Sequence, residues 1–340
     1  MTTFLQIIGM LALGVGLVIA GIYIYIRIKL GKYAKIDTEK DQTPLLIHLN
    51  EEIDPDWISK KDTIEIKNHL NKLGFSEGKT YNVVEMDGMQ LRAFFNSPYT
   101  AVLYTHPVVG LWVDMVANTQ SGIDYTVSNA LMGGEMESSP NDKKFWLRGA
   151  DVLELFNKLK VEVNDDPINV VNNENFRDYF EDAYKKEMQW KSKNGGVSLE
   201  EIKKIALNDS KQYSEEEILE TFRETKRQEL TRWHHGALEE YNKTNDILEN
   251  ECYDRFDYLF IVPSKSDSIG FIRYLSDMYY LTEEQAKKFE NKYKMQNNIE
   301  IKTLFSEINE SFSNDLRAIK KADVSYPIDI EIYEMVKPKY

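Results

Sequence analysis

The residues best suited to chemistry are a histidine and an aspartate in neighbouring β-type runs, His106 and Asp114. A base oriented by a carboxylate supports proton transfer, so the pair would serve a hydrolase. No recognisable nucleophile accompanies them, because the chain has no G-x-S-x-G elbow and Cys252 lies far along the sequence. Pro107 also places His106 at a strand end. Two interpretations stay open: a non-local active site around His106 and Asp114, or a chain without catalytic residues, which the missing nucleophile favours.

Metal and cofactor motifs are incomplete. His235 precedes Glu239 by four residues, which places both on one face of a predicted helix, next to His234. A metal site needs three or four ligands, and no H-E-x-x-H motif or second histidine-rich segment supplies them. Gly133-Gly134 lacks the Lys-Ser/Thr pair of a phosphate-binding loop. We therefore predict no catalytic, cofactor-binding or metal-ligating residues and interpret the histidines as part of a polar helix surface.

The segments that would position His106 and Asp114 have the pattern of a β-rich domain. Short apolar runs are separated by turn residues such as Asp87-Gly88, which is typical of an antiparallel meander. Apolar and polar side chains alternate over residues 123–129, which predicts a sheet with one apolar and one solvent-exposed face. The segment GADVLELFNKLK is predicted to form a helix on the apolar face. We expect an α+β antiparallel-sheet domain over residues 60–162.

The rest of the chain, residues 163–340, is predicted to be a mainly helical and acidic domain. A long helix is expected from about residue 215, and the alternating segment IDIEIYEMV is expected to return as an edge strand. Three helix starts carry capping-box patterns: Ser198 with Glu201, Ser214 with Glu217, and Thr282 with Gln285.

Residues 4–26, FLQIIGMLALGVGLVIAGIYIYI, form an uncharged apolar run. As a helix rising about 1.5 Å per residue, the run spans roughly 35 Å, enough to cross a hydrocarbon core of about 30 Å. A cleaved signal peptide would show a basic residue before a shorter run and a small-residue cleavage site after it, and these features are missing. We predict a retained transmembrane helix, with residues 1–30 as anchor and basic flank and residues 31–59 as a tether.

Basic residues follow the run and none precedes it: Arg27, Lys29, Lys32 and Lys35. Because basic flanks stay in the cytoplasm, we predict a single-pass protein with its N-terminus outside and its C-terminal bulk cytoplasmic. Small residues recur every fourth position at Ala12, Gly16 and Ala20. They would allow a homodimer through the transmembrane helix, or they reflect only that glycine is common in such helices.

The whole chain is acidic, with a net charge of −14. This charge argues against nucleic-acid binding, which needs Lys and Arg to neutralise phosphates. It suits a basic protein partner instead.

The ordered segments YNVVEMDGMQLRAF, AVLYTHPVVGLWVDMV, YTVSNALMGGEMESSP and MQWKSKNGGVSLEEI resemble a group of bacterial single-span membrane-anchored proteins of unknown function. The resemblance covers about residues 40–260. It implies a bacterial inner (cytoplasmic) membrane and a two-part soluble region, and it brings no assigned activity.

These features predict a membrane-anchored cytoplasmic interaction or scaffold protein without enzymatic activity. Two alternatives remain. One is a membrane-tethered hydrolase with its site around His106 and Asp114. The other is a subunit of a larger membrane complex that docks through its helical half.

Overall fold

The structure is a computed structural model in which the chain divides into two compact units. Among the described residues, Leu46–Glu187 form the first unit, and residues 43–45 join Met188 and the residues after it in the second. The division therefore falls later than the boundary expected after residue 162. The predicted α+β class is confirmed. The structure describes residues 43–107, 109–131, 133–208, 212–245, 259–262, 265–278, 280–294, 296, 299–311, 318–321, 326, 328 and 330–336.

The predicted transmembrane helix over residues 4–26 lies outside the described residues. None of the helices within the described ranges combines the length and the apolar character that a bilayer span requires.

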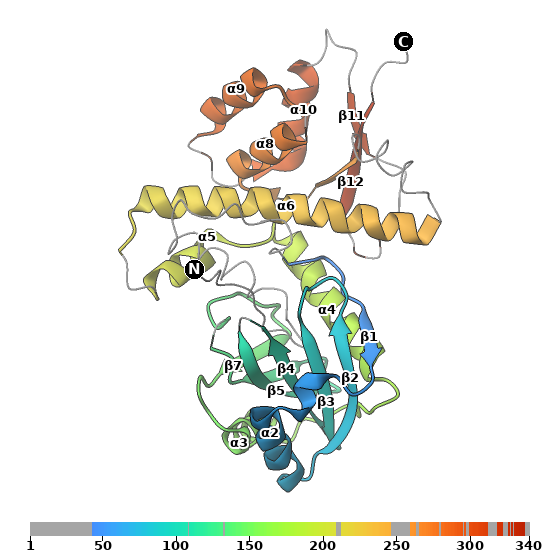
Figure 1. Ribbon diagram of the computed structural model, residues 1–340. Coiled ribbons are helices and arrows are strands. Elements are labelled where there is room, and N and C mark those ends of the chain that lie inside the picture. Colours follow the sequence, from blue (N-terminus) through green and yellow to red (C-terminus); the bar gives the residue numbers. More distant parts are fainter. Residues whose placement is uncertain are drawn as a thin grey trace. The chain divides into compact units, whose positions relative to one another are not determined.

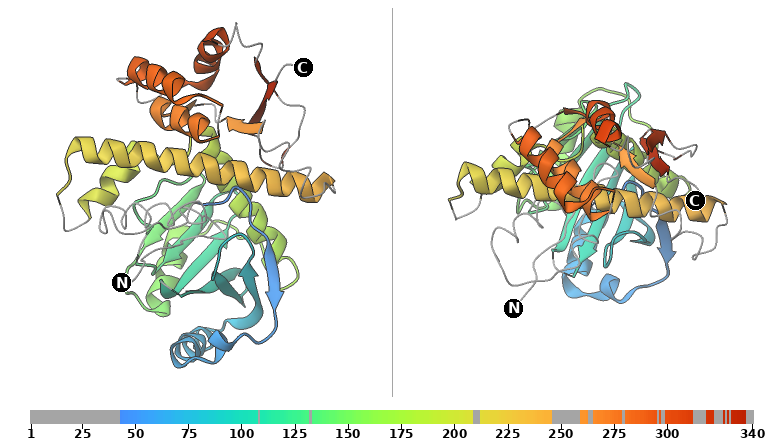
Figure 2. Two further views of the ribbon diagram at one scale, coloured as in Figure 1. Left: turned by 45° about the horizontal axis from the view of Figure 1, so that its top comes forward. Right: turned by 90° about the horizontal axis from the view of Figure 1, so that it is seen from above.

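The first unit is built on a seven-stranded sheet whose spatial order follows the sequence, as the run of colours from blue to green in Figures 1 and 2 shows. The strands are β1 (Leu49–Glu52), β2 (Ser76–Val83), β3 (Gln90–Asn96), β4 (Tyr99–His106), β5 (Gly110–Asn118), β6 (Asp124–Ser128) and β7 (Asp142–Trp146). Strands β1 to β6 pair antiparallel, as predicted, but β7 runs parallel to β6. The sheet is therefore mixed, because the long connection between β6 and β7 returns the chain to the starting end of β6.

One face of this sheet is apolar and carries the core of the unit. Helices α2 (Lys61–Lys72) and α3 (Val152–Val163) contribute to that core, together with the short 3-10 helix η1 (Asp56–Ser59). Leu103, Val113 and Val127 of the sheet and Leu155 of α3 are each fully buried there. Each such side chain stabilises the fold by about 1.5–3 kcal/mol. The prediction that the segment GADVLELFNKLK forms a helix on the apolar face is confirmed.

The opposite face was expected to meet solvent, and this expectation is wrong. Helix α4 (Phe176–Lys193) covers it, with Phe176 and Phe180 fully buried. The Phe176 ring stacks on Tyr81 of β2 at 5.8 Å and meets Phe95 of β3 edge-on at 6.0 Å. On the same face, Thr126 is only 4% exposed. An apolar stripe on α4 therefore buries a sheet face that is partly polar.

The second unit is organised around one long helix, α6 (Glu215–Asn245). The helices α8 (Ser268–Asp277), α9 (Glu283–Tyr293) and α10 (Ile301–Ser311) gather on one side of α6, and α5 (Leu199–Leu207) lies on another (Figure 1). All three predicted capping boxes are present, at Ser198, Ser214 and Thr282. The long helix was likewise predicted correctly.

Short strands complete the second unit: β8 (Leu259–Val262), β9 (Lys265–Ser266), β10 (Ile299–Glu300), β11 (Ala318–Lys321) and β12 (Glu331–Val336). The IDIEIYEMV segment does form a strand, β12. It lies between β11 and β8 in its three-stranded sheet, so it is the central strand and not the edge strand that the sequence predicted.

The described part of the expected tether is packed against folded structure. Leu45, Ile47 and Leu49 are all at most 4% exposed. Thr43 is held within the second unit, where its carbonyl oxygen accepts a 3.1 Å hydrogen bond from the indole Nε1 of Trp233 on α6.

Candidate functional site

The structure does not bring His106 and Asp114 within hydrogen-bonding reach. Asp114 of β5 is opposite Val102 of β4, whereas His106 is opposite Gly110. The two side chains share a sheet face, but the four intervening strand positions separate them by about 13 Å. His106 Nε2 lies 3.2 Å from the carbonyl oxygen of Asp87. Burial lowers the pKa of His106, so its ring is neutral at physiological pH.

Asp114 is the most unusual of the predicted residues. Its side chain is completely buried, and neither carboxylate oxygen has a hydrogen-bond partner of normal geometry. Burial raises its pKa to about 8, although the nearby Ser128 and Tyr104 hydroxyls and the Lys144 ammonium oppose that rise. A buried carboxyl with so little compensation holds its proton near neutral pH, since an ionised carboxylate there would be poorly solvated.

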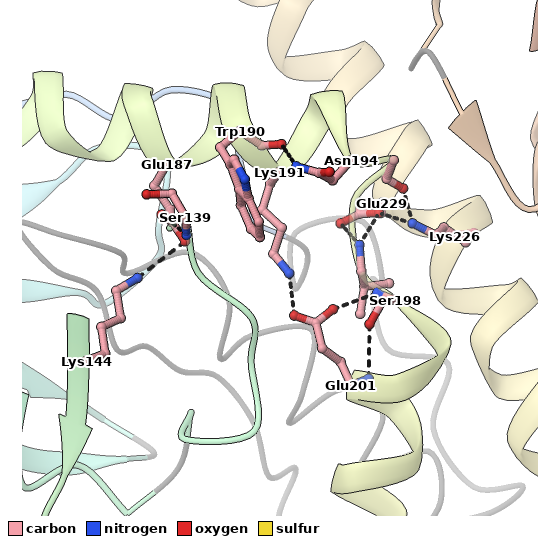
Figure 3. A network of polar contacts seen from close by, with 12 residues as sticks. Ser139, Lys144, Glu187, Trp190, Lys191, Asn194, Ser198, Glu201, Lys226 and Glu229 are labelled. Atoms are coloured by element: carbon pink, nitrogen blue, oxygen red, sulfur yellow. Dashed lines mark hydrogen bonds and ion pairs between the residues drawn. The ribbon is translucent and has the colours of Figure 1, made fainter. Parts of the chain in front are cut away.

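A second unusual carboxyl group lies two strands away, on β7. The carboxyl group of Asp142 lies beside that of Glu187 of α4. Lys144 Nζ lies 3.3 Å from Glu187 (Figure 3). The same atom lies 3.9 Å from Asp142. Burial, followed by the adjacent carboxyl group of Glu187, raises the pKa of Asp142 to about 8. Glu187 also accepts a 3.4 Å hydrogen bond from the backbone N–H of Ser139.

Together with Asp124 of β6, these side chains form what we call the carboxyl cluster: Asp124, Asp142, Glu187 and Lys144. Burial raises the pKa of Asp124 as well, and Asn118 donates a hydrogen bond to it. Strands β6 and β7 supply three members and α4 supplies Glu187, whereas Asp114 of β5 lies four strand positions away from Asp124. Burial thus opposes ionisation of the three aspartates on these adjacent strands.

Aromatic side chains border the carboxyl cluster. Trp112 stacks on Tyr104 with ring centres 4.8 Å apart, next to Asp114. The Trp112 indole Nε1 and the Tyr179 hydroxyl are buried and have no hydrogen-bond partner in the described structure. Burial raises the pKa of both tyrosines well above its usual value, so their hydroxyls stay protonated.

The carboxyl cluster does not form a metal centre. Within the described residues, no group of three or more His, Cys, Asp or Glu side chains is arranged to hold a metal ion. The cluster has one cation, Lys144, which already lies between two of its carboxyl groups.

The sequence analysis missed the cluster although its signals were present. The alternation over residues 123–129 placed Asp124, Thr126 and Ser128 on one face of the sheet. No helix was expected on that face, whereas apolar side chains of α4 pack there against Tyr81 of β2 and Phe95 of β3. The polar side chains of β5–β7 are then covered by the remainder of the helix.

In the second unit, buried ion pairs hold a glycine-rich loop. Lys191 of α4 pairs with Glu201 of α5, and both side chains are at most 1% exposed. Glu229 of α6 accepts hydrogen bonds at 3.1 and 3.2 Å from the backbone N–H of Val197, and Lys226 donates one to the carbonyl oxygen of Gly195 (Figure 3). Burial raises the pKa of Glu229 and lowers that of Lys226, so it opposes charge on both. This arrangement fixes the loop between α4 and α5.

Of the two adjacent histidines on α6, His234 lies in the core and His235 does not. His234 is 1% exposed, and its Nδ1 lies 2.8 Å from the Tyr274 hydroxyl of α8, so interpreting it as a surface residue was wrong. His235 is half-buried, and Glu239 is exposed. His234 therefore contributes to packing between α6 and α8.

Comparison with known proteins does not assign this site. No protein-family model, curated protein or solved structure matched the chain.

Proposed function

We propose that this chain is a single-pass protein of the bacterial inner membrane that binds a protein partner with its cytoplasmic bulk and acts without catalysis. The observation that carries the proposal is the uncharged apolar run over residues 4–26, followed by Arg27, Lys29 and Lys32. An apolar run of this length favours a bilayer span, and the basic flank favours a cytoplasmic C-terminal side.

The acidic bulk defines the kind of partner that we propose. The net charge of −14 favours a protein with a basic surface and disfavours nucleic acid. Contact between two copies through Ala12, Gly16 and Ala20 is part of the same proposal, since small residues allow two helices to approach closely.

Protease protection tests the topology. The full-length chain with a C-terminal tag is expected to stay intact when protease is added to spheroplasts and to be digested once the membrane is permeabilised. A matched variant with Arg27, Lys29 and Lys32 all changed to Glu reverses the flanking charge and is expected to show partial inversion. Digestion of the unchanged chain in intact spheroplasts would refute the cytoplasmic placement.

Purification of the tagged chain from native membranes, with mass spectrometry, tests the binding role. A stoichiometric partner that remains bound through the detergent steps supports the proposal, and a constant set of several partners would identify a subunit of a larger complex. A chain that purifies alone at native expression level would contradict both roles.

A hydrolase is the second candidate, and the buried carboxyl group of Asp114 is the observation that favours it. Carboxyl groups with raised pKa values gather at catalytic sites more often than elsewhere. Asp114, with a pKa of about 8, would act as the general acid, in place of the His106–Asp114 pair. Turnover in a substrate screen that Asp114→Asn abolishes would establish this function. Turnover that the variant retains would exclude Asp114.

A further inference from the structure

Strand β7 is the last strand of the seven-stranded sheet, so one of its edges has no neighbouring strand in that sheet. The ladder with β6 decides which backbone groups lie at this edge. Leu147 N–H donates a 2.8 Å hydrogen bond to the carbonyl oxygen of Ser128, and the same register continues along β7. Because alternate residues of a strand bond to opposite sides, the N–H and C=O groups of Lys144 and Trp146 point away from β6. Among the described residues, none of these groups has a hydrogen-bond partner.

A short segment lies along this edge, and we call its residues 133–139 the strap. The first half of the strap meets the far end of β7. Glu135 forms an ion pair with Arg148, which lies just after the end of β7. A Cβ atom added to Gly134 would lie only 3.0 Å from Cγ of Trp146, so the strap backbone packs against that ring.

The second half of the strap is anchored at the start of β7. Ser138 Oγ donates a 3.4 Å hydrogen bond to the carbonyl oxygen of Asp142, and Ser139 Oγ donates one of 3.3 Å to its carboxylate. Asp142 N–H donates to the carbonyl oxygen of Ser139 at 2.9 Å and closes the turn between them. The strap therefore runs antiparallel to β7. It holds side chains at both ends of β7, but it does not pair with the backbone of Lys144 and Trp146.

The sequence of β7 and the two residues after it, DKKFWLR, is complementary to a second copy of itself in the antiparallel direction. When Phe145 of the two copies lie opposite each other, Lys144 lies opposite Trp146 of the second copy. The outward backbone groups of both strands can then bond to each other. Asp142 is brought opposite Arg148 of the second copy at each end, so opposite charges meet and like charges do not.

The neighbouring registers are less favourable. Pairing centred on Lys144 would place the two Lys144 side chains opposite each other. Pairing centred on Trp146 would place Lys144 opposite Arg148 of the second copy. Like charges in directly opposite positions destabilise a strand pair. Charge therefore selects the register centred on Phe145.

The strap holds the same side chains that this pairing would use. Glu135 of the strap pairs with Arg148, which would otherwise meet Asp142 of a second copy. Ser139 of the strap bonds to the carboxylate of Asp142, which would otherwise meet Arg148 of that copy. The strap and a second copy are therefore alternative occupants of this edge.

We propose that β7 is a dimerisation edge controlled by the strap: when the strap moves aside, β7 of two copies pair antiparallel about Phe145 and join their sheets. In the closed state the Glu135–Arg148 ion pair is an autoinhibitory contact. This contact between copies goes beyond the membrane anchor and partner binding proposed above and does not depend on them. It is also separate from the contact through the transmembrane helix.

Two substitutions that break the same strap contact test the proposal on the full-length chain in detergent. Glu135→Gln frees Arg148 to meet Asp142 of a second copy. Arg148→Gln also opens the strap contact, but it removes the group that Asp142 would meet. We expect Glu135→Gln to lower the dimer dissociation constant about fivefold in analytical ultracentrifugation and Arg148→Gln not to lower it. Equal dissociation constants for the two variants would overturn the proposal.

A cysteine at the two-fold axis tests the register, with Cys252→Ser and Glu135→Gln as the background. Phe145→Cys places the two thiols in a non-hydrogen-bonded pair with Cα atoms about 4.5 Å apart, within reach of a disulfide. We expect air oxidation to cross-link this variant but not Val161→Cys, which is 72% exposed on α3. Equal cross-linking at both positions would refute the register.

Two further outcomes are decided by the same experiments. A dimer in ultracentrifugation without a cross-link at Phe145→Cys would overturn pairing through β7 and leave the transmembrane contact standing. If Phe145→Cys fails to fold, the comparison of Glu135→Gln with Arg148→Gln still decides the proposal, because neither substitution changes a buried apolar side chain.

Discussion

At the residue scale, two side-chain environments are unusual enough to measure. Asp114 is a completely buried carboxyl group without a hydrogen-bond partner of normal geometry, and Gly196 is a glycine whose backbone and surroundings both exclude a side chain. The protonation state of Asp114 depends on how well its surroundings solvate a charge. The need for glycine at position 196 depends on the space around its Cα atom. Each can be tested by a substitution that removes or adds only a few atoms.

Asp114→Asn is expected to stabilise the first unit under alkaline conditions. The amide of asparagine cannot ionise. At high pH the folded variant therefore does not have to bury a charge or keep a carboxyl group protonated, and both of these cost free energy. We expect the free energy of unfolding to rise by on the order of 2 kcal/mol at pH 9 and to stay nearly unchanged at about pH 2.5, where the aspartate is protonated in the folded and unfolded states. Urea unfolding at the two pH values measures this difference, and an equal gain at both would contradict it.

Gly196→Ala is expected to destabilise the second unit. Gly196 has φ of +79°, and a Cβ atom there would lie 1.9 Å from Glu229 Oε2. Backbone strain and the displaced carboxylate should lower the free energy of unfolding by about 2–4 kcal/mol.

Gly236→Ala is the matched control for that change. Gly236 lies within α6 and would place its Cβ at least 4 Å from any other group, so alanine should stabilise the chain by about 0.5–1 kcal/mol through its helix propensity. Similar losses from both substitutions in thermal unfolding would show that space around Gly196 is not the cause.

At the element scale, local sequence signals predicted where helices start, but they did not predict which elements cover each face of the sheet. The capping boxes at Ser198, Ser214 and Thr282 depend on residues three positions apart, so the sequence contains the whole signal. The burial of Asp124 and Thr126 depends on α4, which lies about fifty residues away along the chain. The parallel pairing of β7 likewise depends on how a long connection returns, and residue alternation does not contain that information.

The ion pair between α4 and α5 gives a prediction about these elements. Lys191→Met alone leaves Glu201 buried without its cation, so we expect a loss of about 3–5 kcal/mol. The double variant Lys191→Met with Glu201→Leu replaces both charges by apolar groups and should recover most of that loss. Urea unfolding of the two variants and of Glu201→Leu completes a double-mutant cycle. A double variant no more stable than the single ones would indicate that the pair itself is required.

At the scale of the whole molecule, charge dominates. Acidic side chains outnumber basic ones by 56 to 42, which gives the net charge of −14 and a pI near 5.0. The sequence shows this imbalance directly, but it does not say which surface a partner would contact. Likewise, the carboxyl cluster needed the fold of the first unit before it could be found, since its members are spread from residue 124 to residue 187.

The proposed basic partner gives a salt dependence. If complementary charge attracts the partner, raising the salt concentration from about 50 to 300 mM should shorten the Debye length from roughly 14 to 6 Å and release most of the partner from immobilised full-length chain. Mass spectrometry of the eluted fraction measures the release. Retention through the highest salt concentration would indicate an apolar interface instead.

The hydrogen bond from Trp233 to Thr43 joins residues that are 190 positions apart in the sequence. A ribosome that adds about 5–20 residues per second needs roughly 10–40 s to travel that distance. During synthesis, Thr43 therefore cannot make this hydrogen bond until the middle of α6 has been synthesised. This contact therefore joins an early part of the nascent chain to a part that is made much later.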